Sequence, residues 1–207
     1  MASSEVADMP SHRPNAVALA PELAPELAPE LAISQWLNSS IPLTLASLRG
    51  RVVMLHTFQM LCPACVSHGL PQASKAREMF AERDLSVIGL HTVFEHHAVM
   101  GAAALAAFVH EYGLSFPIGI DQPGAGAVPL TMQAYELRGT PSVVLIDRLG
   151  RVRLNYFGHI EDMALGALVG QLIAEVADSQ ATTIEGMGAA PAAGTGCNDA
   201  GCVPQAD

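Results

Sequence analysis

The sequence predicts an α/β fold with a mixed central sheet covered by helices on both faces, a three-layer α/β/α sandwich. Three apolar runs rich in β-forming residues, at 51–58, 85–91 and 142–147, have almost no polar interruption, which is typical of central strands. Segments with helical periodicity alternate with these runs. The chain has 207 residues, of which 50% are hydrophobic, so it can form one domain with a sizeable core.

Local patterns predict the elements between these strands. Residues 36–38 and 41–45 predict a short hairpin. Residues 66–80 have helical patterning, and we expect a kink at Pro71 because proline removes an amide from the helix. The other predicted helices are 102–112, 131–137 and 163–176, and the other predicted strands are 116–121 and 152–157, of which the latter returns antiparallel after a turn.

Composition divides the chain into a leader, a domain and a tail. Residues 1–33 contain a tandem Pro-Glu-Leu-Ala repeat, and a proline at every fourth position removes amides that a helix interior needs. We therefore expect a disordered leader over 1–33, acting as an extended spacer. The globular pattern of a thiol-containing domain covers residues 34–178. Residues 179–207 hold no Lys or Arg and much Gly, Ala and Pro, which predicts a flexible tail.

Charge and hydropathy exclude several functions. Asp and Glu number 20 against 10 for Lys and Arg, so the net charge is −10 and nucleic acid is not an expected partner. No apolar run approaches the roughly 18 residues of a spanning helix, so no membrane partner is expected. The N-terminus lacks a basic region followed by an apolar one. This predicts a cytoplasmic protein, or a periplasmic one if an export signal was removed.

The motif Cys62-Pro63-Ala64-Cys65 follows the first strong strand and opens a predicted helix. A strand that leads into Cys-x-x-Cys at the first turn of a helix is suited to thiol–disulfide exchange. Free amides at a helix start favour the thiolate of Cys62, and Cys65 lies close enough to resolve a mixed disulfide. The expected partners are protein or small-molecule disulfides and thiols, with a thiol reductant or oxidant.

The same two cysteines allow other interpretations. They could be buried and inert, or they could supply half of a zinc site, which needs about four ligands. His68 makes Cys-x-x-Cys-x-x-His, which is too short for a usual zinc finger, and Val66 stands where a c-type haem site needs histidine. The redox interpretation is favoured, and it requires no cofactor and no metal.

A second set of motifs lies downstream. The segment Arg138-Gly139-Thr140-Pro141 precedes an apolar strand, which continues into Ile-Asp-Arg-x-Gly-Arg-Val. Together with the strand into Cys-Pro-x-Cys, these motifs resemble the thioredoxin fold. The nearest branch in appearance is the TlpA/ResA-like thiol–disulfide oxidoreductases, near the AhpC/TSA redoxins. The resemblance covers roughly residues 35–177.

The resemblance implies roles for two further residues. Pro141 would be the cis-proline that lies against the active-site disulfide and shapes the substrate groove. Glu95 follows the second strong strand, in the region where the family has a glutamate near the active site. A carboxylate there could relay protons to the buried thiol. The alternative, a solvated loop glutamate, remains open.

The chain departs from the family pattern around the motif. Gln59-Met60-Leu61 replaces the usual Trp-Ala-x-Trp before the first cysteine, which implies a flatter and more apolar docking rim. His56 stands where thioredoxins keep a buried acid beneath the disulfide. It could store a proton for Cys65, or it could be a hydrogen-bonded core histidine.

A second cysteine pair, Cys197 and Cys202, lies in the tail. The intervening Asn-Asp and Gly favour a turn, and a flexible tail could let this pair exchange electrons with Cys62. An incidental disulfide and a metal-binding tail are the alternatives for this pair.

Two alternative functions remain for the chain. One is a thiol-dependent peroxidase of the redoxin type, although Gln59 and Leu55 replace the peroxide-binding residues of that class. The other is a metal-binding module that uses both cysteine pairs.

Overall fold

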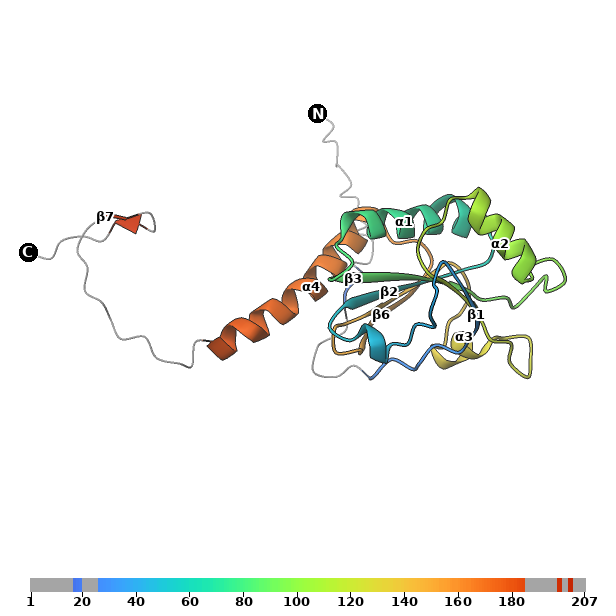
Figure 1. The fold of residues 1–207 in the computed structure, drawn as a ribbon, viewed down its shortest axis with the longest axis horizontal. Helices are drawn as coiled ribbons and strands as arrows, with labels where there is room; N and C mark the ends of the chain where they lie inside the picture. The colour runs from blue at the N-terminus through green and yellow to red at the C-terminus, as the bar shows by residue number, and fades with distance from the viewer. Residues whose placement is uncertain (1–16, 20–25, 185–196, 199–200, 203–207) are drawn as a thin grey trace, which may run out of the picture.

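The computed structural model describes residues 17–19, 26–184, 197–198 and 201–202. Its six main strands are β1 (Ile33–Leu37), β2 (Val52–Phe58), β3 (Leu85–His91), β4 (Ile118–Asp121), β5 (Ser142–Ile146) and β6 (Val152–Phe157). They form one sheet in the order β1-β4-β3-β2-β5-β6 (Figure 1). Strands β2, β3 and β4 are parallel, whereas β1 and β5 run antiparallel to their neighbours β4 and β2. Strand β6 is antiparallel to β5.

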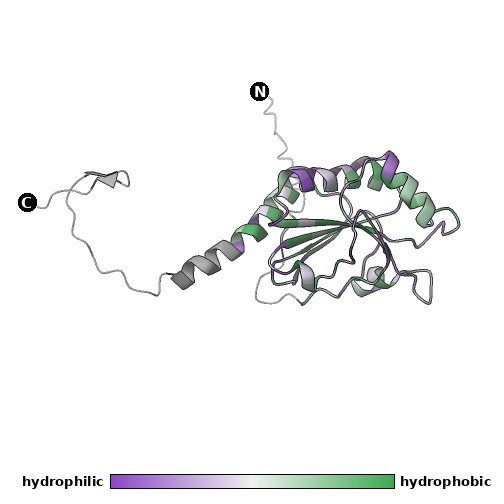
Figure 2. Ribbon diagram, in the orientation of Figure 1, coloured by the Kyte–Doolittle hydropathy of each residue, from purple (hydrophilic) through white to green (hydrophobic). Residues whose placement is uncertain are grey.

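Helices cover both faces of this sheet, as predicted. One face carries α1 (Leu70–Met79), α2 (Ala102–Glu111) and α4 (Asp162–Ile184), and the other carries α3 (Leu130–Ala134) and the 3-10 helix η1 (Ala46–Leu48). Successive side chains of a strand point to opposite faces, so Met54 and Phe58 pack under α1 while Val53 and Leu55 join the other core. Figure 2 shows the strands as mainly hydrophobic, whereas α1 mixes hydrophilic and hydrophobic residues.

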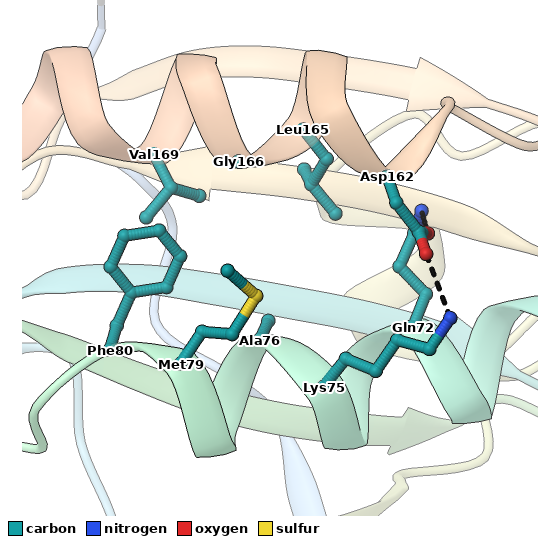
Figure 3. Close-up of a pocket in the computed structure, with 9 residues that line it drawn as sticks. All are labelled: Gln72, Lys75, Ala76, Met79, Phe80, Asp162, Leu165, Gly166 and Val169. Carbon is teal, nitrogen blue, oxygen red and sulfur yellow. Dashed lines mark hydrogen bonds and ion pairs between the residues drawn. The ribbon is translucent and has the colours of Figure 1, made fainter.

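Helices α1 and α4 lie side by side, with a small apolar groove between them (Figure 3). Met79 and Phe80 reach toward Val169 of α4 across this groove. An ion pair between Lys75 and Asp162, with 2.8 Å between Nζ and Oδ2, closes one end of it. None of the site residues predicted from the sequence lines the groove. The groove is therefore a feature of how α1 and α4 pack, separate from the predicted site.

The C-terminal part of the predicted leader is ordered, which corrects the expectation of a disordered spacer over residues 1–33. The chain at 26–32 runs along the domain: the Ala28 amide donates to the Gly150 carbonyl across 2.9 Å, and the Tyr135 hydroxyl donates to the Pro29 carbonyl across 2.6 Å. Proline excludes a helix here, but it is compatible with an extended chain at a sheet edge. Residues 1–16 and 20–25 lie outside the described part.

The predicted hairpin of residues 36–38 and 41–45 does not form. Strand β1 pairs with β4 instead. The chain turns away at Asn38, which has a φ of 55°. Its side-chain amide donates to the carbonyls of Leu114 and Phe116, across 2.6 and 3.1 Å. These long-range bonds hold the end of β1 beside the segment that leads into β4.

Helix α4 also differs from its predicted bounds, because it continues to Ile184. It therefore passes residue 178, at which the domain was predicted to end and the tail to begin. After Gly170, the next glycine or proline is Gly186, so nothing in between favours a helix end. The remaining domain boundaries stay a prediction.

Candidate active site

The topology brings the Cys-x-x-Cys loop and the Gly-Thr-Pro loop to one edge of the sheet. Because β5 runs antiparallel to β2, the last residues of β2 lie opposite the first residue of β5, with Thr57 paired to Ser142. The Ser142 amide donates to the Thr57 hydroxyl across 3.1 Å and locks this register. Cys62 follows β2 and Pro141 directly precedes β5, so the two loops meet.

Cys62 lies at the start of a helix, as predicted. Helical backbone begins at Pro63, and proline suits the first helical position because its missing amide would have no partner there. The Cys65 amide donates to the Cys62 Sγ across 3.4 Å. A serine hydroxyl accepts the same bond at a helix N-cap. The Cys62 Sγ also lies 3.6 Å from the Thr140 carbonyl oxygen, to which the thiol can donate.

Cys65 is fully buried, whereas Cys62 is half-buried, and both are free thiols. Burial raises the pKa of Cys65 to about 12, and its hydrogen bond with Cys62 adds to this rise. Hydrogen bonds from the Gln59 backbone and the Thr140 side chain act in the opposite direction. Cys65 therefore holds its proton at neutral pH, and a partner can reach the sulfur of Cys62 only.

The helix after the motif begins with a π-helical turn, η2 (Cys65–Gly69), before α1 continues. The Leu70 amide donates to the Cys65 carbonyl, five residues back. Pro71 has no amide to donate, so the kink predicted at Pro71 takes the form of this wider turn. Such turns are frequent at functional sites.

His56 lies beneath this turn and is fully buried. Neither of its ring nitrogens has a hydrogen-bond partner among the described residues, so the predicted hydrogen-bonded core histidine is not what the structure contains. Burial lowers the pKa of His56 to about 4, and the ring is therefore neutral. Since neither ring nitrogen has a hydrogen-bond partner among the described residues, no hydrogen bond leads from Cys65 to His56, which argues against the proton-store interpretation.

Pro141 is buried beside the motif, and the Thr140–Pro141 peptide bond is cis. Its carbonyl accepts a hydrogen bond from the Gly158 amide across 2.8 Å, which joins this loop to the end of β6. On its other side, Pro141 approaches the active-site helix at Gly69. The structure thus brings Pro141, Cys62 and Cys65 together.

Glu95 lies farther out than these three residues. It is exposed, and among the described residues it forms no hydrogen bond with either cysteine. Its Oε1 accepts a hydrogen bond from Gln59 Nε2 across 3.3 Å. Gln59 is buried, and its carbonyl accepts the Cys62 amide across 3.2 Å. Glu95 is therefore linked to the motif through Gln59.

Gln59 is a residue of the site that the sequence did not predict. The signal that could have identified it is a polar residue placed between a buried strand and the first cysteine. Its side-chain oxygen is buried and has no partner among the described residues. A buried polar atom of this kind calls for a functional or solvent explanation.

The tail cysteines are described only through their backbone. Strands β7 (Cys197–Asn198) and β8 (Gly201–Cys202) pair antiparallel, with Cys197 opposite Cys202. The predicted exchange of electrons with Cys62 depends on the side chains of Cys197 and Cys202, which lie outside the described part of the structure. Among the described residues, no group of three His, Cys, Asp or Glu side chains could hold a metal ion. None of the described helices has the length and hydrophobicity of a membrane span.

Comparison with known proteins supports the same fold and chemistry. A crystal structure of a thioredoxin-like superfamily protein is 54% identical, with a TM-score of 0.70, and the match covers 71% of this chain and 96% of that one. Thiol-disulfide oxidoreductase ResA of Halalkalibacterium halodurans is 30% identical over 120 residues, which are 58% of this chain and 61% of ResA. These similarities confirm the predicted thioredoxin-like sandwich.

A longer protein shares the same region. Protein DipZ of Mycobacterium bovis is 33% identical over 144 residues, 68% of this chain, and the chain spans only 20% of the length of DipZ. Residues 24–162 match the Redoxin family. The chain therefore belongs to the Redoxin family, and its thioredoxin fold is of the TlpA/ResA-like type.

Proposed function

We propose that the chain exchanges thiols and disulfides through Cys62 and Cys65, with Cys62 as the attacking sulfur. The observation that carries this proposal is the hydrogen bond from the Cys65 amide to the Cys62 Sγ, 3.4 Å long, at the start of a helix. Hydrogen bonds to an ionised acceptor are stronger than those to a neutral one, and a helix N-terminus favours negative charge. The sulfur of Cys62 is therefore the one that meets a hydrogen-bond donor at the helix start, where the reacting thiolate of a cysteine is held in motifs of this type.

The reaction transfers two electrons from the protein dithiol to the partner. The Cys62 thiolate attacks one sulfur of the partner disulfide, forms a mixed disulfide and releases the other sulfur as a thiolate. Cys65 then loses its proton and attacks the Cys62 sulfur. This step forms the Cys62–Cys65 disulfide and releases the second partner thiolate, which takes up a proton. The reverse sequence oxidises a partner dithiol.

Three neighbours serve this exchange in the proposal. The Thr140 carbonyl borders the Cys62 sulfur and Pro141 follows it in the same loop, where the two would shape the groove for the partner chain. The high pKa of Cys65 means that its deprotonation needs a base. Glu95 is linked to the motif by hydrogen bonds through Gln59. We assign it the relay of the Cys65 proton to solvent.

The tail pair would act as a second dithiol that passes electrons to or from Cys62. Residues directly opposite in antiparallel strands have Cα atoms about 4.5–5.5 Å apart, within the range of a disulfide. The pairing of Cys197 with Cys202 in β7 and β8 supports this assignment. The location of the protein, cytoplasmic or periplasmic, stays a prediction.

The test is a single turnover with an aromatic disulfide reagent whose released thiolate absorbs visible light. It uses the full chain with Cys197→Ser and Cys202→Ser, so that only the motif can react. We expect the dithiol form to release two thiolates per chain. Adding Cys65→Ala should limit release to one thiolate and leave a stable mixed disulfide at Cys62. Adding Cys62→Ser should suppress fast release.

Two outcomes would contradict the proposal. Undiminished fast release after Cys62→Ser would show that another group is the nucleophile. Consumption of peroxide at a rate well above that of disulfide reduction would favour the redoxin-type peroxidase instead. Both rates should be measured on the same preparation.

A further inference from the structure

An aromatic ring and a guanidinium group lie at the loop that contacts the attacking sulfur. The Cys62 Sγ contacts the Thr140 carbonyl, 3.6 Å away, and the residue before Thr140 is Gly139. The ring of Phe157 lies against Gly139, where a Cβ would come within 2.8 Å of its Cε2 atom. The Arg138 guanidinium lies over the same ring, 5.9 Å from its centroid. We call Arg138 and Phe157 the ring platform.

The backbone fixes this platform relative to the active site. Phe157 is the last residue of β6 and pairs with Ser142, the first residue of β5. The next residue, Gly158, donates its amide to the Pro141 carbonyl across 2.8 Å. Glycine at 139 is needed because any side chain there would displace the ring. The platform is therefore held by the same loop that borders the Cys62 sulfur.

The platform is open to a partner. Phe157 is 47% exposed, and Arg138 is exposed as well. Leu61, the residue before Cys62, is 58% exposed. In the described part of the chain, no recorded ion pair involves Arg138, and its recorded contact is the Phe157 ring. The chain has a net charge of −10, so the positive charge of Arg138 contrasts with the charge of the chain as a whole.

We propose that the ring platform selects partner segments in which an acidic residue lies within two residues of the reacting cysteine. The apolar part of the segment would cover Phe157, and its carboxylate would pair with Arg138 while Cys62 attacks the disulfide. Guanidinium groups are suited to carboxylates, and charge complementarity mainly sets specificity and association rate. The inference rests on the proposed function, since it names the substrate class of that same site.

The experiment compares two cyclic disulfide peptides in single turnover with the reduced full chain carrying Cys197→Ser and Cys202→Ser. The first peptide is Gly-Thr-Gly-Cys-Asn-Asp-Ala-Gly-Cys-Val-Pro, the sequence of residues 194–204, and the second has Lys in place of Asp. We expect the acidic peptide to react roughly three- to fivefold faster, the effect of one charge pair near a surface. About 0.5 M salt should remove most of this ratio.

Variants of the platform test its two parts separately. Arg138→Glu should invert the ratio in favour of the Lys peptide, and Phe157→Ala should slow both peptides alike. The matched control is Arg83→Glu, which makes the same charge change at an exposed residue just before β3, at the opposite edge of the sheet. It should leave the ratio unchanged.

The outcomes separate this inference from the proposed function. The charge selection would be overturned if the protein with Arg138 and Phe157 intact reduced the Asp and Lys peptides at nearly equal rates. It would also be overturned if Arg83→Glu and Arg138→Glu changed the ratio of these two rates equally. Full rates in Phe157→Ala would overturn the role of the ring. In either case, loss of peptide reduction in Cys62→Ser would still support the attacking role of Cys62. Peptide reduction that survives Cys62→Ser would instead overturn the proposed function.

Discussion

The α-carbon of Gly69 lies directly against the buried ring of His56. A Cβ at position 69 would come within 2.5 Å of the His56 Cε1 and Nε2 atoms and 3.4 Å from the Cβ of Pro141. The central strand, the π-helical turn and the cis-proline loop thus meet at one point of close contact. This contact holds the active-site helix at its distance from the sheet.

The first prediction follows from that contact. Gly69→Ala should lower the free energy of unfolding by about 1–3 kcal/mol, because overpacking a rigid interior forces neighbours to move. Urea unfolding of the reduced protein measures this effect. Gly166→Ala is the matched control, since no atom lies within 4 Å of its Cβ position and alanine favours a helix. Equal effects of the two variants would show that the His56 contact is not tight.

Adding His56→Ala to Gly69→Ala tests the same contact from the other side. Removal of the ring deletes the clash, so the two substitutions together should cost less than the sum of their separate effects. Strict additivity would contradict the close packing of these two residues.

The second prediction concerns the alkaline pH dependence of stability in the reduced protein. Burial raises the pKa of Cys65 to about 12, above the value of about 8.5 for an unfolded thiol. The folded state therefore keeps a proton that the unfolded state loses. This contribution to stability is fully present below about pH 8.5 and is lost as the pH rises toward 12.

The measurement is the free energy of unfolding at several values between about pH 8 and 11. The reduced protein should lose up to about 1.4 kcal/mol per pH unit more than Cys65→Ala does. The comparison with Cys65→Ala removes the contribution of other alkaline groups, such as Tyr135. Parallel curves for the two proteins would mean that the Cys65 thiol ionises as freely when folded as when unfolded.

The third prediction tests the ordered part of the leader. The Glu30 carboxylate accepts hydrogen bonds from the amides of Leu45 and Ala46, across 2.8 and 2.9 Å, at the start of the 3-10 helix η1. Glu30→Ala should cost about 1 kcal/mol of stability, as the loss of a capping side chain does. Thermal or urea unfolding would detect it.

The repeat itself supplies the control for this prediction. Glu26 occupies the same repeat position one unit earlier, and no side-chain hydrogen bond is recorded for it in the described chain. Glu26→Ala should therefore change stability by much less than Glu30→Ala. If both variants were equally stable, the leader would not depend on this cap.

Local patterns in the sequence were enough to identify the central strands and the Cys-x-x-Cys turn. Strand β3 has the predicted bounds, and β2 differs from its prediction by one residue, because buried strands are nearly continuous apolar runs. The ordered leader was missed because proline-rich repeats suggest a spacer. Its partners, such as Gly150 and Tyr135, are distant in sequence.

The same reason limits the prediction of the site. Cys62 and Cys65 are visible in the sequence because four consecutive residues define their chemistry. Gln59 binds Glu95 across a gap of 36 residues, and the Arg138–Phe157 platform depends on how β6 pairs with β5. Such contacts are set by strand pairing, which local periodicity does not contain. They become visible only when the fold is known.

The fourth prediction concerns the tail pair. If Cys197 and Cys202 exchange electrons with Cys62, then Cys65→Ala combined with Cys202→Ser should accumulate a disulfide between Cys62 and Cys197 under mild oxidation, because neither Cys65 nor Cys202 is left to resolve it. A tethered pair has an effective concentration near millimolar. The yield should therefore not fall when the protein is diluted tenfold from the micromolar range.

Trypsin digestion gives a direct readout of this bond. The chain has no Lys or Arg after Arg153, and none between Arg51 and Lys75. The tail cysteines therefore lie on the peptide of residues 154–207, and Cys62 lies on the peptide of residues 52–75. Mass spectrometry should find these two peptides joined by a reducible bond in the variant with Cys65→Ala and Cys202→Ser, and separate once Cys62→Ser is added. If this variant formed only disulfides between two chains, with a yield that falls on dilution, the tail would not serve Cys62 within one molecule.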